Sequence, residues 1–424
     1  MHDSSSNAHW AEPAAADKGW LRSLETGQRY AMGPLFACPA TGGELSVEVD
    51  LEAAAESFAQ DWNQAGSIWK RFSAVLAPFN ADRAVSLGEG STPLVRSERL
   101  ARELGLRNLF FKLEGSNPTG SFKDRQMSVA LSMGRLWGKT LYATISSGNV
   151  GNALSAYCAK AGAEAHVWVA ENTAEAKLRQ IAVYGAQLYH IPAPGPGKMR
   201  AYWELFAGMR AFCEANGAMP MVSARPVNPF MVEGTKTIAF ELAAELGSVP
   251  DEVFCCVGGG GLLGGVTKGF KELREMGLAD RLPRMTGAQR SDQEHAPINR
   301  LHEEPYVSGD YYLPLDGDWA AESIAETEGQ LDLVTDTDIL EAQALLAERE
   351  GIFAEPQGAY AAAALLKASR ETRIDPDATV VCTITGTGLK DMAATARFGE
   401  VVTPKRIIQA QNLNDATFAG ASAN

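Results

Sequence analysis

Short apolar runs alternate with stretches of helical periodicity over most of the chain, from about residue 109 to residue 388. The runs are LFFKLEG, TLYATIS, AEAHVWVA, AQLYHIPA, EVFCCVGGGG, PRMTGAQ and ATVVCTITGTG, and helical stretches start near residues 121, 150 and 173. Strands that alternate with helices are typical of parallel sheets, because a parallel pair needs a long crossover between its strands. The sequence therefore predicts an α/β fold with open sheets.

This pattern also predicts where a ligand would bind. Ligands of open parallel sheets lie beyond the carboxyl ends of the strands. Gly, Ser, Thr and Asn residues gather directly after the apolar runs of this chain, so these loops are the functional candidates. The segment 290–330 differs, because it is polar and aperiodic, and we expect it to form a long surface excursion or a substrate-side loop.

The charge balance argues against two classes of partner. The 38 basic and 52 acidic residues give a net charge of −14, which repels nucleic acid and anionic lipid headgroups alike. No apolar run approaches the ~20 residues of a membrane-spanning helix, and the N-terminal residues lack the basic flank and apolar stretch of a signal peptide. We expect a cytoplasmic protein with no nucleic acid or membrane partner.

Cysteine and histidine spacing predicts no metal site. The six cysteines are scattered, and Cys38 has no second cysteine at CxxC spacing. The six histidines show neither an HExxH motif nor a close pair. Reduced, mostly buried thiols are the expectation.

A lysine follows a glycine-containing turn in the segment EGSNPTGSFKDR, which ends at Arg125. Lys123 stands where a strand has ended and a helix begins. The positive end of a helix disfavours an ammonium group and so favours the neutral amine that Schiff-base chemistry needs. An isolated lysine in a turn is more often a solvated surface residue, and only the flanking sequence favours the functional interpretation.

Three further clusters follow strand-like runs. Ser146, Ser147, Gly148 and Asn149 precede a helix and can bind a carboxylate, or simply cap that helix. The tetraglycine run 258–261 allows a close backbone approach to a phosphate, although a dinucleotide site or a flexible loop is also compatible with it. The run TGTGLKD that begins at Thr385 offers a hydroxyl to a ring nitrogen, or is an ordinary strand-to-loop transition.

Together, the four clusters resemble the tryptophan-synthase-β class of pyridoxal-phosphate enzymes, called fold type II, in both kind and order. The closest resemblance is to the threonine synthase family, whose patterns LGEGxTPL, NPTGSFKDR, GN after small hydroxyl residues, and TGxGLKD correspond to 87–94, 117–125, 146–149 and 385–391. The segment CPATGGELSVEVDLEA also resembles that family's CxxCGG…YDLE segment. The resemblance covers roughly residues 36 to 392.

The resemblance implies a role for each candidate residue. Lys123 would carry pyridoxal phosphate as a Schiff base and remove the Cα proton, and Asn149 would bind the 3-oxygen of the cofactor. Phe122 would neighbour the ring and Thr385 would face its nitrogen. The phosphate would be held by Gly258, Gly259, Gly260, Gly261 and Leu262, and the substrate carboxylate by Ser146, Ser147 and Gly148.

Three of the departures from the family pattern bear directly on the predicted site. The family segment NSxNPxRxEGQKT corresponds here to RPVNPFMVEGTKT, so Arg225 and Met231 replace the Asn and Arg that contact the substrate's phosphate. Arg225 is either a repositioned anion clamp in the substrate site or an exposed loop residue. Gln126 replaces the glycine that usually follows the KDR triplet, which is expected to alter helix packing near the cofactor.

The resemblance implies a lyase or synthase that performs elimination or replacement on an amino acid. Conversion of O-phosphohomoserine to threonine is the best single hypothesis. A β-replacing cysteate synthase-like enzyme, a hydroxy-amino-acid ammonia-lyase and a catalytically silent regulatory subunit that binds pyridoxal phosphate are alternatives. A nucleotide-binding protein would leave the lysine turn unexplained.

The resemblance also implies two α/β domains with the cofactor between them, and a homodimer. We expect an N-terminal arm over residues 1–35, a large domain from 36–124 and 226–424, and a small mobile domain from 125–225.

Overall fold

Parallel sheets dominate the computed structural model, which describes residues 18–76, 81–146, 148–191, 199–291, 298 and 315–398. A six-stranded sheet has the order β12 (Gln330–Val334), β11 (Arg284–Arg290), β10 (Glu252–Cys256), β13 (Thr379–Ile384), β5 (Asn108–Leu113) and β4 (Leu94–Arg96). A four-stranded sheet has the order β8 (Gln187–Ile191), β7 (Glu164–Ala170), β6 (Leu141–Ser146) and β9 (Met219–Pro220). Every pair is parallel except β4 with β5. The predicted fold class is confirmed.

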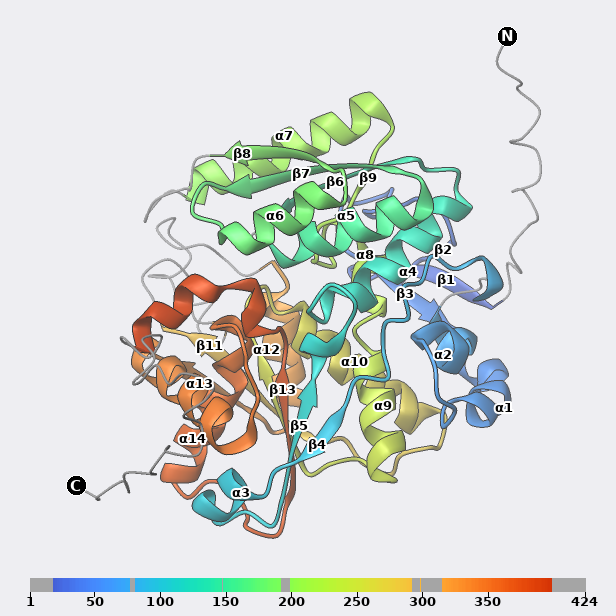
Figure 1. Cartoon of the computed structure of the whole chain (residues 1–424). Helices are drawn as coiled ribbons and strands as arrows, with labels where there is room; N and C mark the ends of the chain where they lie inside the picture. The colour runs from blue at the N-terminus through green and yellow to red at the C-terminus, as the bar shows by residue number, and fades with distance from the viewer. Residues whose placement is uncertain are drawn as a thin grey trace, which may run out of the picture.

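Helices cover both faces of each sheet (Figure 1). They are α1 (Leu51–Asp61), α2 (Ile68–Leu76), α3 (Arg99–Leu104), α4 (Lys123–Leu136), α5 (Asn149–Ala161), α6 (Glu175–Val183), α7 (Met199–Asn216), α8 (Pro229–Glu233), α9 (Thr237–Leu246), α10 (Gly261–Glu275), α12 (Gly317–Glu326), α13 (Asp336–Glu350) and α14 (Tyr360–Arg370). The helices expected near residues 121, 150 and 173 are α4, α5 and α6.

Side-chain size decides which helix packs closely. Strand β10 is buried along its whole length, as expected for a central parallel strand. On one face of its sheet α14 presents a run of buried alanines from Ala361 to Ala364, which lets the helix backbone approach the strands. Larger side chains of α2, α9 and α10, such as Phe72, Phe240 and Phe270, fill the opposite face. The six-stranded sheet is therefore buried on both sides.

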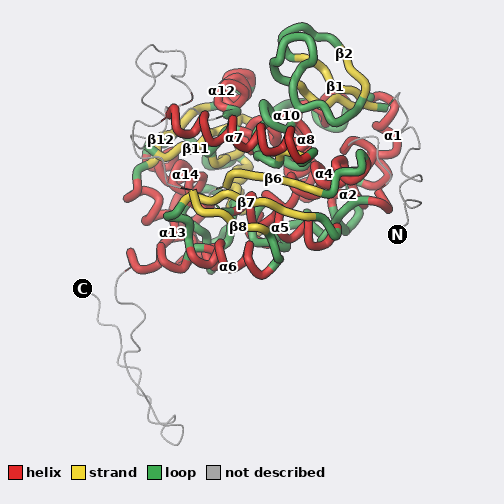
Figure 2. The backbone as a smooth tube through the Cα atoms, turned by 90° about the horizontal axis from the view of Figure 1, so that it is seen from above, coloured by secondary structure: helices red, strands yellow, loops and turns green. Residues whose placement is uncertain are grey.

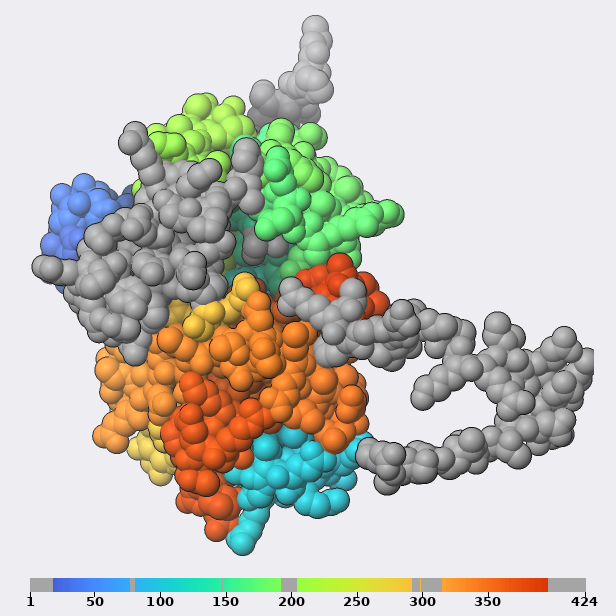
Figure 3. Space-filling model, turned by 90° about the vertical axis from the view of Figure 1, so that its left-hand side faces the viewer, coloured from blue at the N-terminus to red at the C-terminus, as the bar shows by residue number. Residues whose placement is uncertain are grey.

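The molecule has two lobes. The four-stranded lobe, which consists of the four-stranded sheet with α5, α6 and α7, lies above the six-stranded lobe in Figures 1 and 3. Helix α7 covers one face of its sheet and α5 the other. All strands of this lobe come from residues 141–220, whereas the six-stranded sheet uses strands from both sides of that range. The domain limits of 125 and 225 stay a prediction.

The N-terminal region corrects one expectation. Within the predicted arm of residues 1–35, Gly19–Ser23 (β1) and Arg29–Ala31 (β2) are strands, and β1 also pairs antiparallel with Leu45–Val49 (β3). Figure 2 shows this small sheet at one end of the molecule beside α8 and α10. The pairing of β1 with β3 satisfies backbone groups that an arm would leave to water. Residues 1–17 of the predicted arm lie outside the described residues.

Helix α12 is a second difference, because it lies inside the segment 290–330 that we expected to be irregular. Much of that segment, 292–297 and 299–314, lies outside the described residues.

Among the described helices none is long and apolar enough to cross a membrane. All six cysteines are free and buried. The described residues contain no group of three or more His, Cys, Asp or Glu side chains that could hold a metal.

Candidate active site

A cavity of about 300 Å³ lies between the two lobes, at the carboxyl ends of β6, β10 and β13. This is the position at which open parallel sheets bind ligands. It brings together most of the residues that the sequence singled out. Its lining includes Phe122, Lys123, Ser146, Asn149, Gly258, Gly259, Gly260, Gly261, Leu262 and Thr385.

Lys123 is the first residue of α4, and the backbone before it is tied to the end of β13. The amide of Phe122 donates to the carbonyl of Thr385 at 3.1 Å, and Ser121 forms an antiparallel bridge with Gly386. The Lys123 Nζ donates to the Ser223 hydroxyl at 2.6 Å and lies 4.1 Å from the centre of the Phe122 ring. These contacts hold the amine in the cavity.

Burial lowers the pKa of Lys123 from 10.5 to about 8, and the nearby Cys256, Asp316 and Glu355 oppose the shift only in part. Removal from water disfavours the ammonium form more than the amine. A substantial fraction of Lys123 is therefore neutral near physiological pH, as a nucleophilic amine requires.

The tetraglycine loop connects β10 to α10, which starts at Gly261 and has 15 residues. Gly260 has a φ of +99°, and a side chain there would collide with the backbone oxygen of Asp316. Asp316 also donates its backbone N–H to the carbonyl of Gly259 at 2.7 Å. The loop thus needs glycine, and it exposes backbone N–H groups at the positive end of a long helix, which suits a phosphate.

Asn149 begins α5 and carries an unsatisfied polar atom. Its Nδ2 donates to Glu355 at 2.5 Å, while its buried Oδ1 has no hydrogen-bond partner. Glu355 is 2% exposed and also forms an ion pair with Lys177 of α6 at 2.9 Å. The carboxylate therefore fixes the orientation of the Asn149 amide, because the opposite orientation would place two oxygens together.

The other predicted residues at this helix start have different positions. The Ser146 hydroxyl oxygen accepts hydrogen bonds from the amides of Gly148 and Gly151 at 2.9 and 3.0 Å. Gly148 has a φ of +128° and packs against the side chain of Lys177. Ser147 lies outside the described residues. The hydroxyl oxygen of Ser146 thus organises the loop, and the start of α5 remains available to a carboxylate.

The residues around this cavity fit pyridoxal phosphate. A partly neutral lysine, a glycine loop at a helix start, an amide with an orphaned oxygen and the Thr385 hydroxyl all line the same space. The amine can form a Schiff base, the loop can bind phosphate, and the amide and hydroxyl can hydrogen-bond a polar ring. The remaining lining is apolar except for Ser223, Cys256 and Gln357, and its apolar residues are Ile145, Val150, Ala170, Ile191, Leu205, Phe206, Val222 and Leu315.

Arg225 corrects a second expectation. Its guanidinium pairs with Glu44 at 2.9 Å, stacks 4.2 Å from the Trp319 ring and lines a different cavity. Its attraction to a carboxylate is therefore used by a residue of the protein, and the structure does not bring it into the lysine cavity. Met231 is fully buried in the core of the four-stranded lobe and likewise does not line the cavity.

Sequence reasoning missed Ser223, Glu355 and Gln357, which lie in or beside the cavity. Ser223 follows β9 and is a single serine without a motif. Glu355 stands between Ala354 and Pro356, and its only signal is an acid in an otherwise apolar segment. Gln126 was singled out as a departure, and the structure places it beside Ser223.

Comparison with known proteins gives one family. Residues 85–386 match the model of the family described as "pyridoxal-phosphate dependent enzyme". The chain is 34% identical to threonine synthase of Methanocaldococcus jannaschii over 395 residues, which cover 89% of this chain and 95% of that protein. It is 37% identical over 311 residues to threonine synthase of Halalkalibacterium halodurans, covering 72% and 84% of the two chains.

Solved structures show the same fold. Maize serine racemase superposes with a TM-score of 0.57 at 21% identity, covering 72% of this chain and 91% of that one. The processed form of threonine deaminase isoform 2 from Solanum lycopersicum superposes with a TM-score of 0.59 at 19% identity, covering 80% and 84%. At these identities the likeness concerns the fold alone.

Proposed function

The chain belongs to the threonine synthase-like family of fold type II pyridoxal-phosphate-dependent enzymes, and we propose that it converts O-phosphohomoserine and water to threonine and phosphate. The observation that carries the proposal is the joint presence of the Lys123 amine, the glycine loop and Thr385 in one cavity. Identity to threonine synthases over most of the chain supports the choice of substrate.

Pyridoxal phosphate, when bound, withdraws electrons from the Cα of an attached amino acid and makes the Cα proton acidic. Lys123 would hold the cofactor and take up that proton, and its lowered pKa of about 8 suits it to this role. The N–H groups at the start of α10 bind the cofactor's phosphate. Asn149, oriented by Glu355, has a second N–H with which to bind the ring oxygen.

Thr385 determines the type of reaction. A hydroxyl beside the ring nitrogen donates a hydrogen bond without supplying a full positive charge. Negative charge at Cα would then be stabilised less, which favours loss of a leaving group over transamination. A leaving group on Cβ would be lost directly, whereas the phosphate on Cγ of O-phosphohomoserine would leave only after a second proton is removed from Cβ. The substrate carboxylate would bind at the start of α5, beside Ser146 and Gly148, and Ser147 stays a prediction from the sequence.

A hydroxy-amino-acid ammonia-lyase is a second candidate. Among the described residues that line the cavity, Lys123 is the one cation, and the wall around Ile145 and Phe206 is apolar. Such a wall suits a small uncharged side chain better than a phosphate ester. A β-replacing cysteate synthase-like activity would need an anion site as well, so the described lining favours it less.

The substrate class is tested with purified protein loaded with pyridoxal phosphate and given O-phosphohomoserine, O-phosphoserine, threonine or serine separately. Release of phosphate together with threonine from O-phosphohomoserine supports the proposal. Formation of a keto acid and ammonia from threonine or serine, without phosphate release from the esters, identifies the ammonia-lyase instead. Lys123→Ala is the inactive control.

We further propose a cytoplasmic homodimer whose small domain, residues 125–225, closes over the substrate. The family resemblance supports the dimer, and closure of a domain over the substrate is a common gating motion in enzymes. Size-exclusion chromatography coupled to light scattering measures the oligomer, and a monomeric mass contradicts it.

A further inference from the structure

Four side chains form a hydrogen-bonded chain that leads from the cavity into the core. Lys123 Nζ donates to Ser223 Oγ at 2.6 Å, and the Ser223 hydroxyl donates to Gln126 Oε1 at 2.5 Å. Gln126 Nε2 donates in turn to Thr235 Oγ1 at 2.9 Å. Gln126 and Thr235 are fully buried, whereas Ser223 lines the cavity. The chain thus connects the lysine amine that lines the cavity to a dry interior.

The direction of these bonds follows from Gln126. Its Nε2 bonds to Thr235, so its carbonyl oxygen faces Ser223 and can only accept a hydrogen bond. The Ser223 proton is committed to that oxygen, and a lone pair of Ser223 remains for Lys123. Ser223 is therefore an acceptor toward the lysine, and an acceptor stabilises the ammonium form more than the amine.

Two departures from the family pattern meet in this chain of bonds. Gln126 stands where the pattern has glycine, and Thr235 stands where EGQKT has glutamine. The family pattern has a glutamine amide just before α9, at the position of Thr235, whereas this chain has the amide of Gln126 on α4. The side chains of Gln126 and Thr235 contact each other directly. Because both partners changed, the buried polar groups stay satisfied.

We propose that Gln126 and Ser223 are positioning residues for Lys123, in which Gln126 orients the Ser223 hydroxyl so that Ser223 accepts a hydrogen bond from the lysine and stabilises the proton that the lysine takes up. The proposal rests on the proposed role of Lys123 in binding the cofactor but not on the identity of the substrate. It differs from a purely structural role, in which Gln126 would only fill the interior.

The test measures the protonation of Lys123 itself. Cofactor-free protein is mixed with pyridoxal phosphate, and the rate of attachment to the lysine is followed by visible absorbance from about pH 6 to about pH 10, which spans ordinary and shifted lysine pKa values. Only the neutral amine attacks, so the rate rises with pH and levels off. Wild type should show a midpoint near the lysine pKa of about 8.

We expect Ser223→Ala to lower the midpoint by about one pH unit, because one charge-assisted hydrogen bond to the ammonium is lost. Gln126→Met should lower it by about half as much, since the freed Ser223 hydroxyl can turn and donate to the neutral amine. Ser223→Thr keeps a hydroxyl and should restore the midpoint. The charged or ionisable groups near Lys123, namely Cys256, Asp316 and Glu355, are unchanged in all variants.

Gln343→Met is the matched control. Gln343 is also a buried glutamine, and it donates to the carbonyl of Ala354 at 2.9 Å, outside the chain of bonds to Lys123. It should lose stability without moving the midpoint. If Ser223→Ala and Gln126→Met have the same midpoint pH as the control Gln343→Met, the proposed positioning role is wrong. If wild type does not attach the cofactor at all, the proposed function fails instead, and the two failures are distinct.

Discussion

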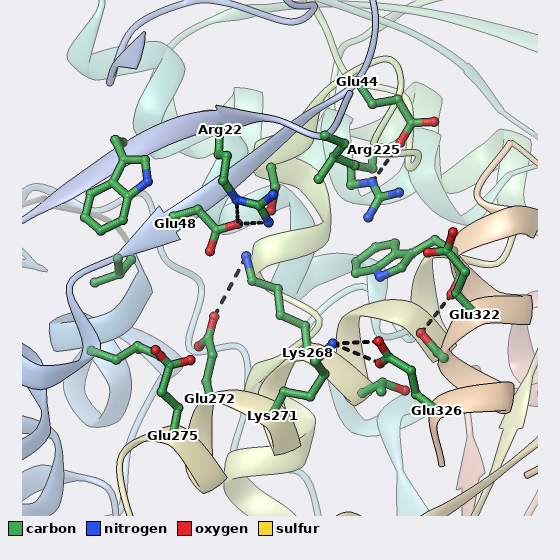
Figure 4. A pocket seen from close by; sticks show the side chains of 18 of the residues that line it. Arg22, Glu44, Glu48, Arg225, Lys268, Lys271, Glu272, Glu275, Glu322 and Glu326 are labelled. Carbon is green, nitrogen blue, oxygen red and sulfur yellow. Dashed lines mark hydrogen bonds and ion pairs between the residues drawn. The ribbon is translucent and has the colours of Figure 1, made fainter. Parts of the chain in front are cut away.

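Two cavities of this protein differ in volume and in the number and pairing of the charged side chains that line them. The lysine cavity has about 300 Å³ and contains one cation among its described lining residues. The second cavity has about 850 Å³ and lies between the β1–β3 sheet and helices α10 and α12 (Figure 4). Its charged side chains pair with one another, for example Arg22 with Glu48 at 2.9 Å and Lys271 with Glu326 at 2.8 Å.

The difference teaches that volume alone does not identify a site. In the larger cavity most cations have protein carboxylates as partners, whereas Arg29 lies over the Trp20 ring. Partly exposed pairs such as Arg22 with Glu48 contribute about 0–1 kcal/mol each. In the smaller cavity a lysine, backbone N–H groups at a helix start and the Thr385 hydroxyl line one space with a largely apolar wall. The kind and arrangement of the polar groups, not the volume, mark the site of chemistry.

The largest expected effect is at the glycine loop. Gly260→Ala forces a side chain into a left-handed backbone position and against the Asp316 backbone. We expect the affinity for pyridoxal phosphate to fall about tenfold to a hundredfold, in line with the usual cost of such strain. Gly138→Ala is the matched control, because Gly138 also has a positive φ but open space around it. Equal affinities of the two variants in a fluorescence titration would contradict the assignment of the loop.

The next effect concerns the ion pair that joins the lobes. Glu355→Gln leaves Lys177, whose side chain is 13% exposed, without its carboxylate and removes the acceptor that orients Asn149. We expect a loss of about 1–3 kcal/mol in the free energy of unfolding. Lys177→Met should cost much less in the Glu355→Gln background than alone, as urea unfolding of the four proteins would reveal. Additive losses would mean that the pair does not couple the lobes.

Asp316 lies between the two cavities and gives a pH-dependent prediction. Burial raises its pKa to about 7, although the backbone N–H of Arg225 opposes the shift. The folded chain therefore holds this proton more tightly than the unfolded chain, and the stability it contributes is lost as pH rises through about 7. Asp316→Asn cannot lose a proton, so its stability relative to wild type should improve by at least about 1 kcal/mol between about pH 4 and about pH 7. Thermal unfolding at several pH values checks this, and a constant difference would refute it.

The smallest effect is expected in the larger cavity. Arg225→Met breaks the pair with Glu44 and the stacking on Trp319. Stability should change by about 0–1 kcal/mol, and cofactor affinity and turnover should stay within about twofold of wild type because the guanidinium does not line the lysine cavity. A tenfold or greater loss of turnover with intact folding would return Arg225 to the substrate site.

The fold was predictable where the signal is local and repeated. Alternating apolar runs and glycine loops indicated open parallel sheets, the starts of α4, α5 and α6, and most of the cavity. The expectation of two domains came from the family resemblance. Strand β1 was missed because it has five residues and is stabilised by pairing with β3 more than twenty residues later. Helix α12 was missed because its ten residues, GDWAAESIAE, follow a long polar and aperiodic stretch, and the segment 290–330 was interpreted as a whole.

Side-chain partners from distant parts of the chain were not predictable. Arg225 has the chemistry of an anion clamp, but its carboxylate partner is Glu44, 181 residues away. Ser223 has no motif, and its role emerges only from its contacts with Lys123 and Gln126. Local sequence thus indicates which groups are available, whereas tertiary contacts decide which of them remain free for a ligand.

The most direct test of the central claim is to load the protein with pyridoxal phosphate, reduce it with borohydride and locate the modified residue by peptide mass spectrometry. Reduction makes the bond between lysine and cofactor permanent. The account predicts one cofactor on Lys123 in wild type and none in Lys123→Ala. A cofactor on another lysine, or no attachment in wild type, would contradict the assignment of this cavity as the active site.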